Sequence, residues 1–388
     1  MNSDNMNFDF KTPRRIISEP GCSADSSFFA SLQLRGKILL VTDATLVKLG
    51  IATKVLEALV AANLEVIVFD QVEPEPKVET VRKALDFVKA ESIDTVIGLG
   101  GGSPMDIAKI LALLLKTPQE ISTLYGVGNC RGDRLPLVLI PTTAGTGSEV
   151  THVAVVTGDD GEKSPIVDAI LICDTVLLDA TLTIGLPPRI TAATGIDAMV
   201  HAMEAFTSGL RKNIVSDQLA IDAFQLLYNN ISEAVHNGTN LQARQAMLTG
   251  SMLAGLAFAN ATVGAVHALS YPLGAQYHLP HGESNALVMV PVMRFNGQKA
   301  FPLYAALCKV VHPDQSQLDE KALSNYLLDQ IATLIPSLGL PTRLSAYGIG
   351  KQDLNALVVG TLHQARLLSY NYTPMEKVDI HAVFEGLL

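Results

Sequence analysis

The chain has 388 residues, of which 48% are hydrophobic and 17% are charged, and its formal net charge is −10. Single hydrophobic cores rarely extend beyond roughly 250–300 residues, so we expect two domains. The low charge content excludes an intrinsically disordered protein, and a negative chain without a basic cluster excludes nucleic acid as a partner.

The N-terminal segment and the cysteines indicate where the protein resides. The first 15 residues are polar and lack the apolar run of a secretory signal. The four cysteines are scattered and form no CxxC pair, which is typical of a reducing compartment and excludes a cysteine-rich zinc module. We therefore expect a cytoplasmic protein.

From residue 37 onwards, short β-branched runs alternate with amphipathic helical stretches. Predicted strands lie at 37–43, 65–70, 95–101 and 136–142, and predicted helices at 46–63, 78–92 and 103–116. This alternation predicts βαβ units and a parallel sheet. Further strands are predicted at 152–157, 169–174 and 176–179, and the turn-rich segment 158–165 is a candidate hairpin loop.

The pattern changes after the LPPR segment at 186–189. Periodic stretches rich in Ala, Leu and Met follow, at 190–208, 214–236 and 241–271. We predict an α/β dinucleotide-binding domain with a Rossmann-like parallel sheet over residues 1–185. An all-helical domain is predicted over residues 186–388.

One segment raises the question of a membrane. Residues 245–282 contain no Asp, Glu, Lys or Arg, and this span exceeds the roughly 20 residues that cross a bilayer. However, glycines recur in it, and Asn260, Gln276 and three histidines would be costly in lipid. We interpret the segment as helices buried in a soluble domain and predict no membrane association.

A glycine-rich loop, GLGGGSPMD, follows a predicted strand and begins a predicted helix. Gly100, Gly101 and Gly102 allow the backbone to approach a diphosphate, whose charge the helix N-terminus attracts. Ser103 is a candidate N-cap, and Asp106 is a candidate for the third helical position. A glycine turn between a strand and a helix can also be purely structural.

A second loop, PTTAGTGSE at 141–149, also follows a predicted strand. The hydroxyl groups of Thr142, Thr143, Thr146 and Ser148 can hydrogen-bond phosphate and ribose. Because ligands of open parallel sheets bind at the carboxyl ends of the strands, two such loops predict a dinucleotide. A solvated surface loop is the alternative.

Asp43 stands at the end of the first predicted parallel strand. A carboxylate there can accept hydrogen bonds from an adenosine ribose and would repel a 2′-phosphate, which favours NAD over NADP. A helix N-cap is the alternative role, and the two roles are compatible.

Asp197 and His201 are four residues apart on a helix predicted to begin near Pro187 or Pro188. Residues with this spacing share one face of a helix, so both side chains can bind one ion. A carboxylate combined with neutral imidazoles suits iron(II) or zinc rather than magnesium or calcium.

Two further histidines are candidate ligands of the same ion. His267 lies in the charge-free helical segment, and His281 is expected in a loop. His278 competes with His281 for the same role because it is three residues away. From the residues alone, a histidine in such a position is more often a structural core or surface residue than a ligand.

Four segments carry a resemblance to a known family. They are GGGSPMDIAK (100–109), PTTAGTGSEVT (141–151), LPPRITAATGIDAMVHAMEAF (186–206) and GAVHALSYPLGAQYHLPHG (264–282). With these motifs in this order, the chain resembles the iron-containing (group III) alcohol dehydrogenases over nearly its whole length. The resemblance implies an α/β domain followed by a helical domain, with catalysis in the cleft between them, and a homodimer or larger oligomer.

The resemblance also implies roles for particular residues. The metal ligands correspond to Asp197, His201, His267 and His281, which leaves His278 out. The cofactor contacts correspond to Gly101, Gly102 and Ser103 at the diphosphate, Thr142, Thr143 and Thr146 near the nicotinamide, Lys163 near its ribose, and Asp43 at the position that separates NAD from NADP users.

Two positions depart from the family pattern. Many members carry a histidine four residues after the third ligand, close to the nicotinamide, where this chain has Tyr271. A tyrosine can relay a proton, although its ordinary pKa of about 10 suits that role less well, and we predict Tyr271 and His267 as catalytic residues. Glu75 replaces an asparagine that some members have in the cofactor region.

The predicted reaction is reversible oxidation of a small, uncharged alcohol to an aldehyde or ketone, with hydride transfer to NAD and a divalent metal as Lewis acid. Val153 and Phe258 are predicted to line an apolar substrate pocket. One alternative is a hydroxyacid–oxoacid transhydrogenase, which would turn over without added NAD. A lyase like dehydroquinate synthase would need a basic phosphate pocket, and residues 245–282 contain no Lys or Arg. A non-enzymatic metal or nucleotide sensor is the remaining alternative.

Overall fold

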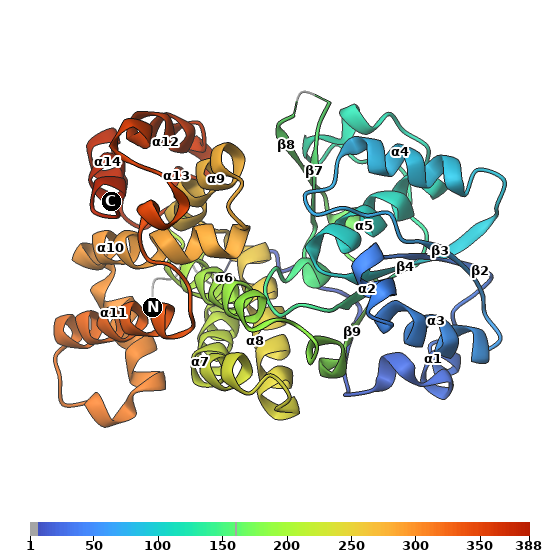
Figure 1. Cartoon of the computed structure of the whole chain (residues 1–388), viewed down its shortest axis with the longest axis horizontal. Coiled ribbons are helices and arrows are strands. Elements are labelled where there is room, and N and C mark those ends of the chain that lie inside the picture. The colour runs from blue at the N-terminus through green and yellow to red at the C-terminus, as the bar shows by residue number, and fades with distance from the viewer. Residues whose placement is uncertain (1–6, 160) are drawn as a thin grey trace. The chain divides into compact units, whose positions relative to one another are not determined.

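The computed structural model describes residues 7–159 and 161–388, which form two compact units. One unit spans Lys11–Gly185, and the other spans Leu186–Leu388 together with the segment that ends at Phe10. The first unit contains a parallel sheet and the second is helical (Figure 1). The predicted fold class is therefore confirmed.

The α/β unit is built on a six-stranded parallel sheet with the order β1-β9-β6-β4-β2-β3. Its strands are β1 (Arg15–Ser18), β2 (Lys37–Val41), β3 (Glu65–Phe69), β4 (Ile93–Gly100), β6 (Leu137–Pro141) and β9 (Thr175–Leu178). β4 and β6 are buried along nearly their whole length, as expected of parallel strands with both faces covered.

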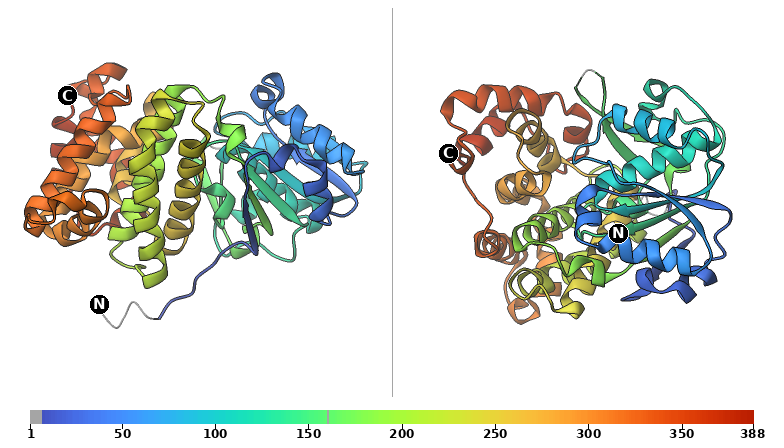
Figure 2. Two further views of the ribbon diagram at one scale, coloured as in Figure 1. Left: turned by 90° about the horizontal axis from the view of Figure 1, so that it is seen from below. Right: turned by 45° about the vertical axis from the view of Figure 1, so that its right-hand side comes forward.

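Helices pack on both faces of this sheet (Figure 2). On one face, α1 (Ser26–Ser31) and α3 (Ile51–Ala61) bury apolar side chains against alternate sheet residues such as Ile97 and Leu99. On the other face, α5 (Gly102–Lys116) lies so close to β4 that a Cβ atom at Gly98 would lie 2.8 Å from the Cβ atom of Ala108. The helix α4 (Val78–Phe87) packs beside α5.

Two predicted elements of this unit were wrong. The helix predicted over 46–63 is divided into α2 (Ala44–Lys48) and α3, because Gly50 between them has a left-handed conformation with φ 73°. The strand predicted over 169–174 is instead a short 3-10 helix at Ala169–Leu171, and Asp168 caps it by accepting a hydrogen bond from Ile170 N at 3.1 Å.

A second, three-stranded sheet contains the predicted hairpin. β7 (Val153–Thr157) pairs antiparallel with β8 (Lys163–Val167), and β5 (Gly126–Val127) adds to β8. The sequence pattern placed residues 163–165 in the loop, whereas they begin β8. Their mixed polar and apolar character hid a strand that is only partly buried.

The second unit consists of helices. They are α6 (Pro188–Thr207), α7 (Ile214–His236), α8 (Leu241–Ala261), α9 (Ala265–Tyr277), α10 (His281–Val311), α11 (Glu320–Ser337), α12 (Leu354–Leu362), α13 (Ala365–Tyr370) and α14 (Lys377–Glu385). α6 begins at the predicted proline and is buried along most of its length. Gly195 on α6 and Gly250 on α8 permit close packing, since a Cβ atom at either position would lie under 3.0 Å from a neighbouring side chain.

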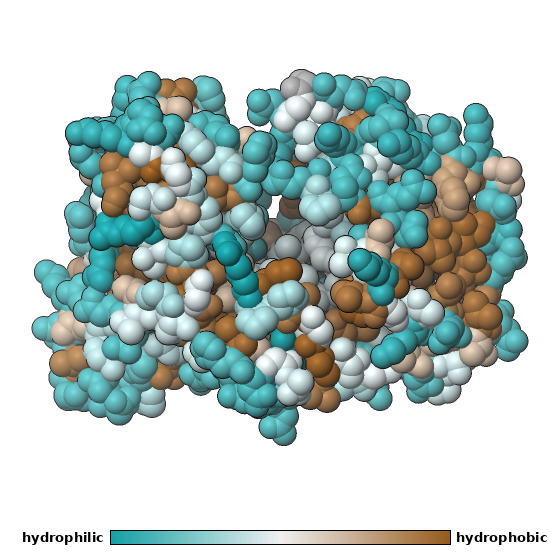
Figure 3. Space-filling view, viewed as in Figure 1, coloured by the Kyte–Doolittle hydropathy of each residue, from teal (hydrophilic) through white to brown (hydrophobic). Residues whose placement is uncertain are grey.

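Among the described residues, no single helix is long and apolar enough to cross a membrane. The pair α8 and α9, which covers most of the charge-free segment, passes such a test by length and composition when taken together, but the two helices meet at an angle of 105°. Apolar side chains also reach the surface: they lie among polar ones over much of the face shown in Figure 3 and gather in one area over the α/β unit, at the right of the view. Across both units, the exposed large apolar side chains include Leu49, Val60, Leu210 and Val378.

Candidate functional site

The two predicted cofactor loops lie side by side at the carboxyl edge of the parallel sheet. Gly100 at the end of β4 pairs in register with Pro141 at the end of β6, and Thr142 N donates a hydrogen bond to Gly100 O at 2.9 Å. The adjacent strand ends bring together residues 100–103 and 142–148. This edge is where open parallel sheets bind their ligands.

The glycines of the first loop are required by close contacts. A Cβ atom at Gly102 would lie 3.2 Å from Thr146 Cγ2, and one at Gly101 would lie 3.5 Å from Thr143 Oγ1. Gly100 has φ 153°, and a Cβ atom there would lie 2.6 Å from Pro104. The backbone of one loop therefore packs against the threonine side chains of the other.

The start of α5 differs from the prediction. Gly101 is the N-cap residue and α5 begins at Gly102, so Ser103 is not the N-cap and Asp106 lies beyond the third helical position. The Asp106 carboxylate accepts hydrogen bonds from Ser148 Oγ at 2.6 Å and from Val155 N at 2.9 Å. These contacts connect α5 to the second loop. The cofactor contacts assigned to Asp106 and Ser148 stay predictions.

Asp43 follows β2 and caps α2, because its Oδ1 accepts hydrogen bonds from Thr45 N and Leu46 N at 2.8 and 2.9 Å. Asp43 thus has the helix N-cap role that was predicted as its alternative. The cap uses Oδ1 and does not involve Oδ2. Lys163 at the start of β8 forms an ion pair with Glu75 Oε1 at 2.9 Å. Lys163, which was predicted to lie near the nicotinamide ribose, is therefore paired with Glu75, the residue that replaces the asparagine of some family members.

In the helical unit, four predicted ligands converge from three helices. Asp197 and His201 lie on α6, His267 lies on α9, and His281 is the first residue of α10. Asp197 Oδ1 is 3.6 Å from His281 Nε2 and 3.9 Å from the Nε2 atoms of His201 and His267. The latter two nitrogens are 3.1 Å apart. The expectation that His281 lies in a loop is wrong.

The packing of α6 against α10 explains why glycine follows His281. A Cβ atom at Gly282 would lie 2.3 Å from Ala193 O, so any larger residue would force the two helices apart. His278, the competing candidate, is exposed at the C-cap of α9 in a left-handed conformation with φ 56°. It does not belong to the cluster of Asp197, His267 and His281 whose ligand atoms lie within 4.8 Å of one another.

Asp197, His267 and His281 offer ligand atoms that lie within 4.8 Å of one another, and His201 Nε2 adds a donor 3.1 Å from His267 Nε2, so the four groups suit a divalent metal ion in chemistry. Metal–ligand bonds of about 2.0–2.2 Å place neighbouring ligand atoms roughly 3.0–3.6 Å apart, and the observed separations of 3.1–3.9 Å are close to this range. Asp197, His201 and His267 are at most 5% exposed. Three imidazoles and a carboxylate are the donors expected for iron(II) or zinc.

The pKa values of these groups follow from burial and from one another. Burial lowers the pKa of His201 to about 4, and the nearby His267 and His281 add to this effect. His201 is therefore neutral at neutral pH, the state in which imidazole binds metals. Burial alone would raise the pKa of Asp197, but the three histidines outweigh burial and hold it below its ordinary value.

Two residues around the cluster were missed by sequence reasoning. Glu204 Oε2 accepts a hydrogen bond from His267 Nδ1 at 2.7 Å, and Asn285 Nδ2 donates one to Asp197 Oδ1 at 2.6 Å. Helical spacing could have found both. Glu204 is three residues after His201 on the same helix face, and Asn285 is four residues after His281.

Phe258 and Tyr271, to which substrate and proton-relay roles were assigned, both adjoin the ligands. The Phe258 ring on α8 stacks on the His201 imidazole with a centroid distance of 4.3 Å. The Tyr271 ring lies 6.0 and 6.4 Å from the rings of His281 and His267. Burial raises the pKa of Tyr271 to about 12, so its hydroxyl keeps its proton at neutral pH.

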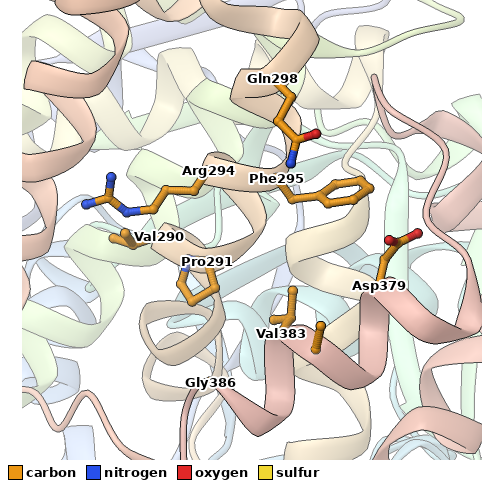
Figure 4. A pocket seen from close by; sticks show the side chains of 9 residues that line it. Val290, Pro291, Arg294, Phe295, Gln298, Asp379, Val383 and Gly386 are labelled. Carbon is orange, nitrogen blue, oxygen red and sulfur yellow. The ribbon is translucent and has the colours of Figure 1, made fainter.

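A groove of about 580 Å³ lies elsewhere in the helical unit. Figure 4 shows that its labelled side chains come from α10, with Arg294 and Phe295 among them, and from α14, with Asp379 and Val383. None of the predicted site residues lines this open groove. It is therefore separate from the ligand cluster.

The α/β unit has a parallel sheet with paired loops at its carboxyl edge, and the helical unit brings together an aspartate and three histidines. These are the features of a nucleotide-linked metalloenzyme. Comparison with known proteins agrees. Residues 13–180 match the model for iron-containing alcohol dehydrogenase, and residues 191–388 match that for the C-terminal part of the Fe-containing alcohol dehydrogenase family.

Individual relatives align over almost the whole chain. Long-chain-alcohol dehydrogenase 1 of Geobacillus thermodenitrificans is 39% identical over 352 residues, which cover 90% of this chain and 89% of that protein. A crystal structure of 1,3-propanediol oxidoreductase matches with a TM-score of 0.93 at 33% identity, covering 98% and 100% of the two chains. Sulfoacetaldehyde reductase from Bifidobacterium kashiwanohense, solved in complex with NAD+, matches with a TM-score of 0.87 at 28% identity, covering 98% and 99%.

The chain belongs to the iron-containing alcohol dehydrogenase family. The resemblance inferred from the four motifs is thereby confirmed. The predicted reaction class, oxidoreduction of alcohols and aldehydes, is confirmed as well, because the similar proteins are alcohol dehydrogenases and aldehyde reductases.

Proposed function

We propose that this protein is an iron-dependent, NAD-linked dehydrogenase that reversibly oxidises a small alcohol to its aldehyde or ketone, with zinc as the alternative metal. In the forward direction the alcohol carbon gives a hydride to C4 of the nicotinamide, and the hydroxyl proton leaves to solvent. The main support is the convergence of four ligand side chains from helices α6, α9 and α10, of which Asp197, His201 and His267 are buried.

Each part of the chain has a proposed task. Lys11–Gly185 form the cofactor domain, which starts later than the predicted residue 1, and Asp43 and the loops after β4 and β6 hold NAD there. Residues 186–388 form the metal domain, in which Asp197, His201, His267 and His281 hold the ion. When bound, a divalent iron acts as a Lewis acid toward the substrate hydroxyl.

Side chains next to the ligands are proposed to shape the reaction. Phe258 offers an apolar ring beside His201, which suits an uncharged substrate. The Tyr271 hydroxyl keeps its proton and can donate a hydrogen bond toward a reacting oxygen or pass a proton onward. Val153 is proposed as a second apolar contact for the substrate, and Lys163 as a contact for the nicotinamide ribose.

The substrate is best sought with a panel, because the similar proteins act on different molecules. Their names specify long-chain alcohols, 1,3-propanediol and sulfoacetaldehyde. We expect NADH formation with short alcohols or diols and NADH consumption with the matching aldehydes. Activity with NADP should be lower, since Asp43 would repel the 2′-phosphate.

The test of the metal site is the substitution Asp197→Ala. We expect the protein to lose most of its bound metal and turnover to fall about 1,000-fold, because a Lewis acid contributes several kcal/mol to lowering the barrier. The calorimetric affinity for NAD should stay unchanged. Asp222→Ala, at an exposed position on α7, is the matched control and should keep full activity. Full turnover of the Asp197→Ala protein, or of wild type after exhaustive chelation, would refute the proposal.

We further propose that the protein is cytoplasmic and assembles as a homodimer or larger oligomer. Its four cysteines form no disulfide, which suits a reducing compartment. The oligomer rests on the family resemblance, and sedimentation of the purified protein tests it. A monomer at micromolar concentration would contradict it.

A further inference from the structure

Glu204 is a buried carboxylate directly behind one of the proposed metal ligands, His267. It lies on α6, seven residues after Asp197 and three after His201, so all three side chains project from one face of the helix. It is 5% exposed. A buried carboxylate is costly unless its oxygens are hydrogen-bonded, so its two partners determine what it does.

Both oxygens of Glu204 are engaged by the first turn of α9. Oε2 accepts a hydrogen bond from His267 Nδ1 at 2.7 Å, and Oε1 accepts one from Val266 N at 2.7 Å. Gly264 makes this approach possible, because a Cβ atom there would lie 3.3 Å from Glu204 Oε1. One side chain thus binds both the backbone that begins α9 and the imidazole that α9 carries.

The connection between α8 and α9 shows that the start of α9 is held in place. Thr262, between the two helices, has φ 89° and ψ 165°, a conformation that is essentially restricted to glycine. Such backbone strain persists only where surrounding contacts enforce it. The bonds from Glu204 to α9, and that from Ser208 Oγ to Ala261 O at 2.6 Å, are contacts of this kind.

We propose that Glu204 is a positioning residue for the metal centre, which selects the tautomer and the orientation of His267. With Nδ1–H committed to Glu204 Oε2, the Nε2 lone pair of His267 faces Asp197 and His201, where the metal ion is proposed to bind. A carboxylate behind a histidine ligand also raises the basicity of that ligand. This inference rests on the proposed metal site.

The substitution Glu204→Gln separates this role from packing, since it preserves the shape. Val266 N can only donate, so the glutamine oxygen must stay with it, and the glutamine NH2 group then faces His267 Nδ1. His267 can accept from that NH2 group only as the tautomer that carries its proton on Nε2. That proton occupies the lone pair that would bind the metal.

The experiment measures Co²⁺ affinity by competition with a chelator and records the visible absorption of the bound Co²⁺. We expect Glu204→Gln to weaken Co²⁺ binding 10–100-fold and to change the absorption spectrum, with kcat reduced at partial metal loading and NAD affinity unchanged. Glu149→Gln, the same exchange at a buried glutamate of the α/β unit, is the matched control and should bind Co²⁺ as wild type does.

Each outcome decides the inference. Glu204→Gln protein with wild-type affinity and an unchanged spectrum overturns it while leaving the proposed metal site intact. Wild-type protein that binds no Co²⁺ overturns the proposed function and this inference with it. If Glu204→Gln loses its helical circular dichroism, Glu204→Asp is measured instead. That variant keeps the charge on a shorter side chain, so intermediate affinity supports the inference and wild-type affinity overturns it.

Discussion

Lys109 in the α/β unit and Asp197 in the helical unit are both buried charged residues, with exposures of 0% and 3%. Lys109 is surrounded by hydrogen-bond acceptors. Its Nζ donates to Ser148 Oγ and Val153 O at 2.7 Å each and to Thr151 Oγ1 at 3.2 Å. It also forms an ion pair with Asp106 Oδ1 at 3.5 Å. Ser148 in turn donates to Asp106. The donors and acceptors of this cluster satisfy one another.

The cluster around Asp197 has the opposite character. Three imidazole Nε2 atoms face one carboxylate oxygen, and their outer contacts, such as that of His267 Nδ1 with Glu204, hold them in this arrangement. The comparison shows how two buried polar clusters can be distinguished. In the Lys109 cluster the charged groups neutralise each other, so the cluster stabilises the fold. In the Asp197 cluster the lone pairs converge on a common point, which suits the binding of an added cation.

The largest effect on stability is expected where the self-contained cluster is broken. Lys109→Met should destabilise the α/β unit by about 3–5 kcal/mol, because it leaves the Asp106 carboxylate buried without its cation. Native-state hydrogen exchange of peptides from α5 measures the change. Lys37→Met, which removes a lysine paired with Glu65 and Glu91 at the surface, is the control and should have a much smaller effect. Equal effects of the two variants would show that the buried Lys109 cluster adds no more stability than a surface ion pair.

A smaller, pH-dependent effect is expected at Glu149. Burial raises the pKa of Glu149 to about 7, and its Oε1 has no hydrogen-bond partner among the described residues. The folded protein therefore holds a proton that the unfolded chain releases near pH 4.5. Stability contributed by this proton is complete below pH 4.5 and is lost as the pH rises to about 7, by roughly 3 kcal/mol.

Glu149→Gln should remove this pH dependence, because the amide is neutral at every pH. Unfolding of both proteins by urea between pH 4.5 and 8 measures it: the stability difference in favour of the variant should grow with pH. Asp179→Asn is expected to show the opposite sign, since hydrogen bonds from Ser23 and Thr181 outweigh burial and lower the pKa of Asp179. A constant difference between wild type and Glu149→Gln would refute the assignment.

The smallest effect is expected at Tyr271, whose ring lies 6.0 Å from that of His281. With its pKa raised to about 12, the hydroxyl releases a proton poorly, so Tyr271→Phe should lower kcat by no more than about tenfold and leave the shape of the pH profile unchanged. Tyr271→His should instead raise kcat near neutral pH and add a titrating group near pH 6.5. A break in the wild-type profile that is absent from the Tyr271→Phe profile would show that tyrosine ionisation matters.

Much of this architecture could be predicted from local sequence patterns. Alternation of strands and helices predicted the parallel sheet, and the four-residue spacing predicted that Asp197 and His201 share a helix face. Local patterns failed where a single residue redirects the chain, as Gly50 does between α2 and α3. They also failed at 169–174, because an apolar run looks the same whether it pairs with a strand or is capped by Asp168.

The sequence by itself determined the elements, the family and the kinds of ligand, because periodicity, glycine motifs and residue spacing act within a few turns of the chain. Tertiary structure alone decided which distant groups meet. Glu204 reaches His267 across 63 residues and Asn285 reaches Asp197 across 88. Such contacts depend on how α6, α9 and α10 pack, and packing is determined by many weak apolar contacts together. No single residue specifies this packing. The orientation of His267 and the partners of Lys109 are therefore determined only by the tertiary structure.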